Sequence, residues 1–254
     1  QSQMCIRDSD EVIKLEDNSD SKIVRTEDGS YSAKSIIIAN GGEHNKLGVP
    51  GEETLAGKGV SYCATCDGNF FANQSVVVIG GGDAAVDEGL YLTRMTKDVT
   101  IIHRRDKLRA SNILQERAFS NPKVAFKLDS VVEEIRGEEQ VNSVLLRDLA
   151  SGDTSETSTN GVFIYIGYHP NSKFLEGVVD LDKGGHVVTN LQMETSSNGI
   201  FACGDIRQYS DRQLGTAGGL SLIHISEPTR PVRMGDARMC GVKKKGGGGG
   251  AGGG

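Results

Sequence analysis

Short runs of apolar residues, separated by turn residues, predict β-strands along most of the chain. In residues 11–39 apolar and polar positions alternate, and Asp28-Gly29 is a hairpin signal between two such stretches. Residues 36–39 are apolar throughout, which is typical of a buried strand. This part of the chain is predicted to form a small β-meander that leads into one core strand.

The pattern changes period twice within residues 75–106. Residues 76–79 are an apolar run, residues 80–85 are rich in glycine, residues 84–94 have helical spacing and residues 99–103 are a second apolar run. The connection between the two apolar runs is long enough for a parallel crossover. We therefore predict a strand, turn, helix and strand unit.

Turn residues divide the rest of the chain. Asn40-Gly41-Gly42 ends the meander's last strand and places a domain boundary near Lys46, and the pattern changes again at His169-Pro170-Asn171. Further strands are predicted at residues 124–128, 131–135, 141–149, 162–166 and 199–202. Strands that alternate with a helical crossover predict an α/β fold.

Length and charge limit the possible functions. A chain of 254 residues has room for one or two domains, and its net charge of -6 argues against a protein that binds nucleic-acid backbones. No apolar run approaches the roughly 18 residues of a membrane-spanning helix, and the N-terminus lacks the apolar region of a signal peptide. We expect a cytoplasmic protein with no nucleic-acid and no membrane partner.

The two ends of the chain differ from the middle. The segments MCIRDS and SLIHISEPTR resemble translated sequencing-adapter reads, and the last residues are lysines followed by glycines. We expect residues 1–9 to be a non-native leader and residues 220–254 to be a non-native flexible tail. A natural basic, glycine-rich tail is the alternative.

The turn Gly80-x-Gly82-x-x-Ala85 matches the dinucleotide fingerprint, and it lies between a predicted strand and a predicted helix. Its glycines allow the turn and the approach of a pyrophosphate, and Asp83 lies within it. At the end of the next strand the chain reads His103-Arg104-Arg105, with Arg109 following. A guanidinium there binds a 2′-phosphate through charge-assisted hydrogen bonds, which favours NADPH over NADH. The alternatives are a glycine-rich turn without a ligand and a solvated basic turn.

Cys63-Ala64-Thr65-Cys66 has the spacing of a redox disulfide, and Asp67 follows it. Asp67 either exchanges a proton with a departing thiol or shapes the turn with Gly68. A zinc site needs four ligands, and the sequence has no second pair of this kind, so no metal is expected. Cys203 reads as a buried core residue. Because a disulfide is a poor direct acceptor of a hydride, an electron relay, most simply a flavin, is expected between the two groups.

Taken in order, the motifs CATCDG, VIGGG, HRR, IGYHPN, GD and RQ make the chain similar to thioredoxin reductases of the low-molecular-weight bacterial type. The resemblance implies two Rossmann-like domains, the NADPH domain being inserted into an incomplete FAD domain. Residues 10–45 and 170–219 would be the two parts of the FAD domain, and residues 46–169 would be the NADPH-binding domain with the CxxC pair.

The resemblance also implies the roles of single residues. Cys66 would face the flavin, Cys63 would attack the disulfide of thioredoxin, and Asp67 would be proton donor and acceptor. The residues implied to bind NADPH are Gly80, Gly82, Asp83, Ala85, His103, Arg104, Arg105 and Arg109, and those implied to bind FAD are Gly204, Asp205, Arg212, Gln213 and Ala217. The complete protein is expected to be a homodimer.

The family carries a second glycine fingerprint for the FAD pyrophosphate, and this sequence has the strand, turn and helix context only at Gly80. We therefore expect about a third of the enzyme to be absent from the front and FAD binding to be impaired. Two alternatives stay open: the flavoprotein subunit of an alkyl hydroperoxide reductase, which shares this core, and a non-catalytic nucleotide-binding module with structural cysteines.

Overall fold

The computed structural model describes residues 10–18, 21–210 and 212–221. The chain divides into two units. The central unit is His44–Tyr168, and the outer unit combines Gln1–Glu43 with His169–Gly254. The predicted leader, residues 1–9, and residues 222–254 of the predicted tail (220–254) lie outside the described residues. Residues 220 and 221 are described and belong to a helix. Among the described residues, no helix is long and apolar enough to cross a membrane.

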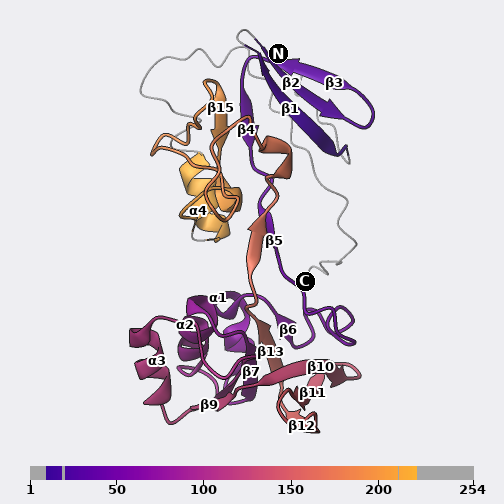
Figure 1. Ribbon diagram of the computed structural model, residues 1–254, viewed down its shortest axis with the longest axis vertical. Helices are drawn as coiled ribbons and strands as arrows, with labels where there is room; N and C mark the ends of the chain where they lie inside the picture. The colour runs from indigo at the N-terminus through magenta and orange to yellow at the C-terminus, as the bar shows by residue number, and fades with distance from the viewer. Residues whose placement is uncertain (1–9, 19–20, 211, 222–254) are drawn as a thin grey trace. The chain divides into compact units, whose positions relative to one another are not determined.

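A five-stranded parallel sheet forms the middle of the central unit, with the strand order β6-β13-β7-β8-β9 (Figure 1). Its strands are β6 (Val60–Ser61), β7 (Ser75–Ile79), β8 (Asp98–Ile102), β9 (Val124–Lys127) and β13 (Gly161–Ile164). The helices of the unit are α1 (Ala64–Asp67), the 3-10 turn η1 (Gly68–Phe71), α2 (Asp83–Leu92) and α3 (Asn112–Phe119). The predicted strand, turn, helix and strand unit is β7, α2 and β8.

Both faces of this sheet are buried, which explains why its strands read as continuous apolar runs. Alternate residues point to opposite faces of a strand, so Val76 and Val78 pack with Val86 and Leu92 of helix α2. Val77 and Ile79 pack into a second cluster on the other face. The sheet is therefore the middle layer of three.

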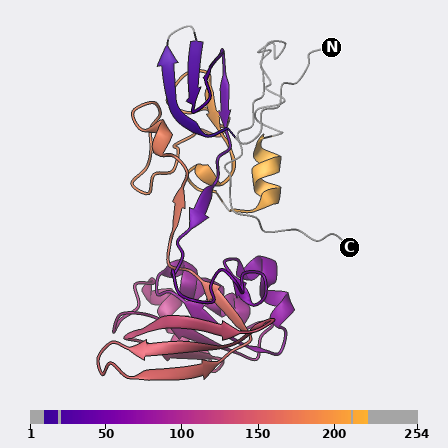
Figure 2. The ribbon, with the colours of Figure 1, turned by 90° about the vertical axis from the view of Figure 1, so that its right-hand side faces the viewer.

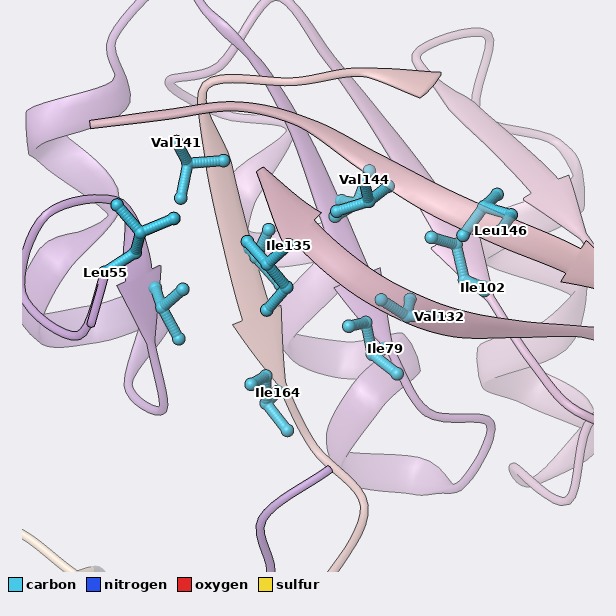
Figure 3. Close-up of a cluster of buried hydrophobic side chains, with 12 residues drawn as sticks. Leu55, Ile79, Ile102, Val132, Ile135, Val141, Val144, Leu146 and Ile164 are labelled. Carbon is cyan, nitrogen blue, oxygen red and sulfur yellow. The ribbon is translucent and has the colours of Figure 1, made fainter. Parts of the chain in front are cut away.

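The third layer is an antiparallel sheet of β10 (Ser130–Gly137), β11 (Val141–Asp148) and β12 (Thr154–Ser158), whose strands lie side by side in Figure 2. Its apolar face meets the parallel sheet (Figure 3), where Val132 and Val144 lie in the same cluster as Ile79 and Ile102. This layer covers the face of the parallel sheet that the helices leave open.

The described residues of the outer unit include an antiparallel sheet and a parallel sheet. One is the antiparallel meander β1 (Val12–Asn18), β2 (Ser21–Thr26) and β3 (Ser30–Ala33), as predicted. The other is the parallel pair β4 (Ile36–Ile38) and β15 (Ile200–Ala202), followed by the 3-10 turn η3 (Gly204–Ile206) and helix α4 (Leu214–Ser221). The remaining elements are the 3-10 turn η2 (Lys173–Leu175) and the paired strands β5 (Gly42–His44) and β14 (Tyr168–Pro170). The α/β class predicted from the sequence is confirmed.

Candidate active site

The two cysteines of the CxxC motif form a disulfide at the start of helix α1. Cys63 and Cys66 are joined with their Cα atoms 5.3 Å apart. Cys63 is the N-cap of α1, and its Sγ accepts a 3.2 Å hydrogen bond from the N–H of Cys66. The Oγ1 of Thr65 lies 3.3 Å from the same sulfur. Cys63 is half-buried and Cys66 is exposed, so a reagent can reach the pair.

A buried hydroxyl links Asp67 to the disulfide loop. The Oγ of Ser61, a residue only 5% exposed, donates a 2.6 Å hydrogen bond to Oδ2 of Asp67. The Oγ of Ser61 also accepts a 3.0 Å hydrogen bond from the N–H of Cys63. The N–H of Asp67 donates to the carbonyl of Cys63 at 3.0 Å, which closes the loop a second time. Sequence reasoning found Asp67 and missed Ser61.

The same short helix is held from its other sides. The N–H of Ala64, which is 1% exposed, donates a 2.6 Å hydrogen bond to the hydroxyl of Tyr165. Gly68 follows the helix, and a Cβ there would lie 2.9 Å from both Leu92 Cδ2 and Met95 Sδ. The CxxC motif is therefore fixed against the end of helix α2. Burial raises the pKa of the Tyr165 hydroxyl, and the nearby charge of Glu88 raises it further. This hydroxyl therefore stays neutral.

The glycine turn lies between β7 and α2 and meets the steric demands predicted for it. Gly80 has φ +149°, and a Cβ there would lie 2.4 Å from the carbonyl oxygen of Tyr165 and 2.7 Å from Cβ of Ala85. Gly82, the N-cap of α2, has open space in front of it, because a Cβ there would meet nothing within 4 Å. A phosphate can therefore approach the backbone at Gly82.

The loop after β8 is joined to the glycine turn. The N–H groups of Arg109 and Ala110 both donate to the carbonyl of Gly81, at 2.6 Å and 3.0 Å. The carboxylate of Asp83 accepts a 2.6 Å hydrogen bond from the N–H of Ser111. Asp83 thus holds this loop through Ser111, a contact that its sequence position did not reveal.

His103 and three arginines form the polar side of this region. The His103 ring is 6% exposed and lies against Gly81, where a Cβ would be 2.4 Å from its Nδ1. Its Nε2 is buried without a hydrogen-bond partner among the described residues. Burial lowers the pKa of His103, and the charges of Arg109, Arg105 and Arg104 lower it further.

All three arginines are exposed, and within the described part of the chain no carboxylate forms an ion pair with them. Guanidinium groups with no carboxylate partner, next to a glycine turn, suit a phosphate-bearing ligand. The structure therefore brings together the residues that sequence reasoning assigned to NADPH.

The residues that the sequence assigned to FAD lie together in the outer unit. Gly204 has φ +73°, and a Cβ there would lie 3.5 Å from Cβ of Ala217 in helix α4. The Oδ1 of Asp205 accepts a 3.2 Å hydrogen bond from Ser210. Arg212 and Gln213 are exposed and lead into α4, whose residue Ala217 donates its N–H to the Gln213 carbonyl at 3.0 Å. Glycine suits position 204 because φ +73° is a backbone conformation that other residues rarely adopt.

A parallel sheet with a dinucleotide-type glycine turn, and a CxxC disulfide in the same unit, define an α/β protein of the nucleotide-binding, disulfide-containing class. A model of the pyridine nucleotide-disulphide oxidoreductases matches residues 3–227. The chain belongs to the pyridine nucleotide-disulphide oxidoreductase family.

Relatives within this family share much of the sequence. The chain is 52% identical over 210 residues to a thioredoxin reductase of Bacillus subtilis (strain 168), covering 82% of this chain and 66% of the relative. It is 44% identical over 214 residues to a thioredoxin reductase of Peptoclostridium acidaminophilum, covering 82% of this chain and 68% of the relative. The chain thus spans about two thirds of the length of these curated relatives.

Solved structures give the same result for the fold. The chain is similar to the crystal structure of thioredoxin reductase from Streptococcus pyogenes MGAS5005, with a TM-score of 0.80 and 49% sequence identity. The match covers 83% of this chain and 69% of that chain. A thioredoxin reductase from Giardia duodenalis matches with a TM-score of 0.78 at 31% identity, over 83% of this chain and 70% of that one.

Proposed function

We propose that this chain carries the nucleotide site and the redox disulfide of an NADPH-dependent thioredoxin-disulfide reductase. The observation that supports this most is the presence of the Cys63–Cys66 disulfide and the glycine turn at Gly80 in one unit. Relatives that are about half identical in sequence are named thioredoxin reductases.

NADPH is the nucleotide that the residues fit. The open backbone at Gly82 would receive the pyrophosphate, and Arg104, Arg105 and Arg109 would hold the 2′-phosphate. Gly80 and Ala85 would shape the turn, and Asp83 would act through the loop that carries Arg109.

For FAD the chain supplies part of a site. Asp205, with Gly204 before it, would meet the ribityl chain, and Arg212, Gln213 and Ala217 would line the ring system. The sequence has no second glycine turn between a strand and a helix, which the FAD pyrophosphate would need. The residues present therefore fit one side of a flavin and not its pyrophosphate, and we derive no reaction step through it.

The chain's own contribution is thiol–disulfide exchange. When bound, NADPH would supply the hydride whose two electrons reduce the Cys63–Cys66 disulfide to a dithiol. In the resulting dithiol, one cysteine thiolate attacks a disulfide of the partner and forms a mixed disulfide. The second cysteine then attacks that bond, closes Cys63–Cys66 again and releases the partner as a dithiol. Asp67 would take up and return the protons of these thiols, and the implied division of labour gives the first attack to Cys63.

Thioredoxin is the proposed partner, and a homodimer is the proposed state of the complete protein. An exposed aromatic residue close in sequence to the disulfide supports a protein partner: Phe70 is 78% exposed and follows Cys66 by four positions. Exposed aromatic side chains are enriched at protein interfaces.

The proposal can be tested without a flavin. The 254-residue chain is reduced with dithiothreitol, freed of reductant and mixed with oxidised thioredoxin, and the thiols of both proteins are then counted by alkylation and mass spectrometry. Electrons are expected to move to thioredoxin from the native chain and from Cys240→Ser, a control that removes a cysteine outside the CxxC motif. Cys63→Ser should not react, and Cys66→Ser should stop at a mixed disulfide. No transfer from a chain shown to hold the 63–66 dithiol would reject the function.

A further inference from the structure

Ser61 stands out among the residues around the disulfide because its hydroxyl contacts both the carboxylate of Asp67 and the backbone of Cys63. It donates to the carboxylate of Asp67 at 2.6 Å and accepts from the N–H of Cys63 at 3.0 Å. Both bonds lie in a single short loop that contains the disulfide. A hydroxyl has one proton to donate. The Ser61 hydroxyl has two acceptors within reach, the Asp67 carboxylate at 2.6 Å and the Cys63 carbonyl at 3.3 Å, and the contact with Asp67 is the shorter.

The position of Ser61 is fixed by the fold. It lies in strand β6, where it pairs with Phe163 of β13, a residue that is fully buried. At 5% exposure its hydroxyl has little access to water. A buried hydroxyl keeps its protein partners because leaving them unsatisfied costs free energy.

We propose that Ser61 is a positioning residue for the redox pair, whose hydroxyl holds the Asp67 carboxylate in the orientation that lets it take a proton from a cysteine thiol. This rests on the proposed function, in which Asp67 is the proton acceptor and donor. Without the hydroxyl, the carboxylate is free to rotate to water, and the thiol has to lose its proton to solvent.

The test measures closure of the disulfide in the 254-residue chain. The reduced chain is mixed with oxidised glutathione: one cysteine thiolate attacks the glutathione disulfide and releases one glutathione, and the second cysteine releases the other as Cys63–Cys66 forms. The protein loses two electrons and two protons, and two reduced glutathiones leave. Acid quenching and mass spectrometry of the peptide with both cysteines give the rate from pH 5 to pH 10.

Ser61→Ala is expected to close the disulfide about tenfold more slowly than the native chain at pH 7, the loss expected for a hydrogen bond to a charged group. Above about pH 9 the two rates should converge, because the thiols then ionise without help. Ser61→Thr keeps a hydroxyl in a strand and should recover most of the rate. Ser61→Gly also lacks the hydroxyl and checks the result if Ser61→Ala does not fold.

Ser143→Ala is the matched control. Ser143 is also 5% exposed, and its hydroxyl donates a 2.5 Å hydrogen bond to the carboxylate of Glu156, in the antiparallel sheet. Its removal should leave the closure rate unchanged at every pH.

Asp67→Asn completes a double-mutant cycle. If Ser61 acts through Asp67, the double variant should be no slower than Asp67→Asn alone. The proposal is rejected if Ser61→Ala closes the disulfide as fast as the native chain at pH 7, or if its closure rate is reduced by the same factor at every pH. It is also rejected if the rate reductions of Ser61→Ala and Asp67→Asn multiply in the double variant. Because no thioredoxin is present, each of these results is independent of the test of the proposed function.

Discussion

The hydroxyl of Tyr165 accepts a 2.6 Å hydrogen bond from the backbone N–H of Ala64, the residue that follows Cys63. The carbonyl of the same tyrosine lies against Gly80, where a Cβ would be 2.4 Å away. One residue after strand β13 therefore touches both the disulfide motif and the nucleotide turn. Replacing the Tyr165 side chain should therefore affect the disulfide motif, while the contact of its backbone carbonyl with the glycine turn stays in place.

Tyr165→Phe keeps the ring and removes the acceptor of the Ala64 N–H. Ala64 is 1% exposed, so water cannot replace the hydroxyl, and an unsatisfied buried donor costs about 1 to 3 kcal/mol. The free energy of unfolding, measured by urea titration, should fall by that amount. Tyr91→Phe is the control, since the Tyr91 hydroxyl makes no hydrogen bond within the described residues. Equal stability of both variants would show that the bond contributes nothing.

His103 should make stability depend on pH below neutrality. Burial and the neighbouring arginines lower its pKa, so the folded chain takes up its proton at a lower pH than the unfolded chain does. Stability is then retained above the unfolded pKa of about 6.5 and decreases as the pH falls below it. Melting temperatures of the native chain should drop more between pH 6.5 and pH 5 than those of His103→Gln. Parallel curves would contradict this.

The exposed arginines should distinguish a 2′-phosphate from a 2′-hydroxyl. Arg104→Ala and Arg105→Ala each remove charge-assisted hydrogen bonds of about 1.5 to 3 kcal/mol, so the affinity for 2′,5′-ADP should fall roughly tenfold or more. The affinity for 5′-AMP should change little. Isothermal titration calorimetry measures the affinity of each variant for both ligands. Arg117→Ala, an exposed arginine on α3, is the control, and an equal loss for both ligands would argue against a 2′-phosphate contact.

Glu88 should destabilise the fold at neutral pH. Its Oε2 is buried without a partner in the described structure, and burial, followed by the charge of Asp87, raises its pKa. The folded chain therefore favours the protonated acid, and the penalty appears as the pH rises above the unfolded pKa of about 4.3. Glu88→Gln should melt at a higher temperature than the native chain at pH 7 and at the same temperature near pH 4. Glu116→Gln, at an exposed site, should show neither effect.

The purified chain should hold little flavin. Its FAD residues include no glycine turn for the pyrophosphate, so a large part of the binding free energy is missing. The visible absorbance of the purified protein, compared with its peptide absorbance, gives the flavin content directly. A yellow protein with one flavin per chain would contradict the expectation.

The parts of the fold that depend on local patterns could be predicted from the sequence. Strands β7 and β8 were found because they are short apolar runs, and the turn between β7 and α2 because of its glycines. Helix α2 was predicted to reach Arg94 but ends at Leu92, where the hydroxyls of Thr93 and Thr96 bond to the carbonyls of Leu90 and Leu92. Side-chain bonds of this kind compete with the helix and leave the apolar spacing unchanged.

The rest depends on contacts between distant residues. Helix α3 was missed because Ala118 is its single buried residue, so it shows almost no apolar stripe. The bond from Ala64 to Tyr165 joins residues 101 positions apart, and that from Ser111 to Asp83 joins residues 28 apart. Motif spacing identified which groups are reactive, but only the fold shows which neighbours hold them.

Helix α2 has a nucleotide turn at one end and the disulfide motif packed on the other, since Gly82 is its N-cap and Gly68 lies against Leu92. Its 10 residues make it a rod of about 15 Å. The glycine turn and Gly68, the residue that follows the disulfide motif, thus lie at opposite ends of one helix. Adding or removing residues in α2 would therefore change the distance between Gly82 and Gly68 without altering either motif.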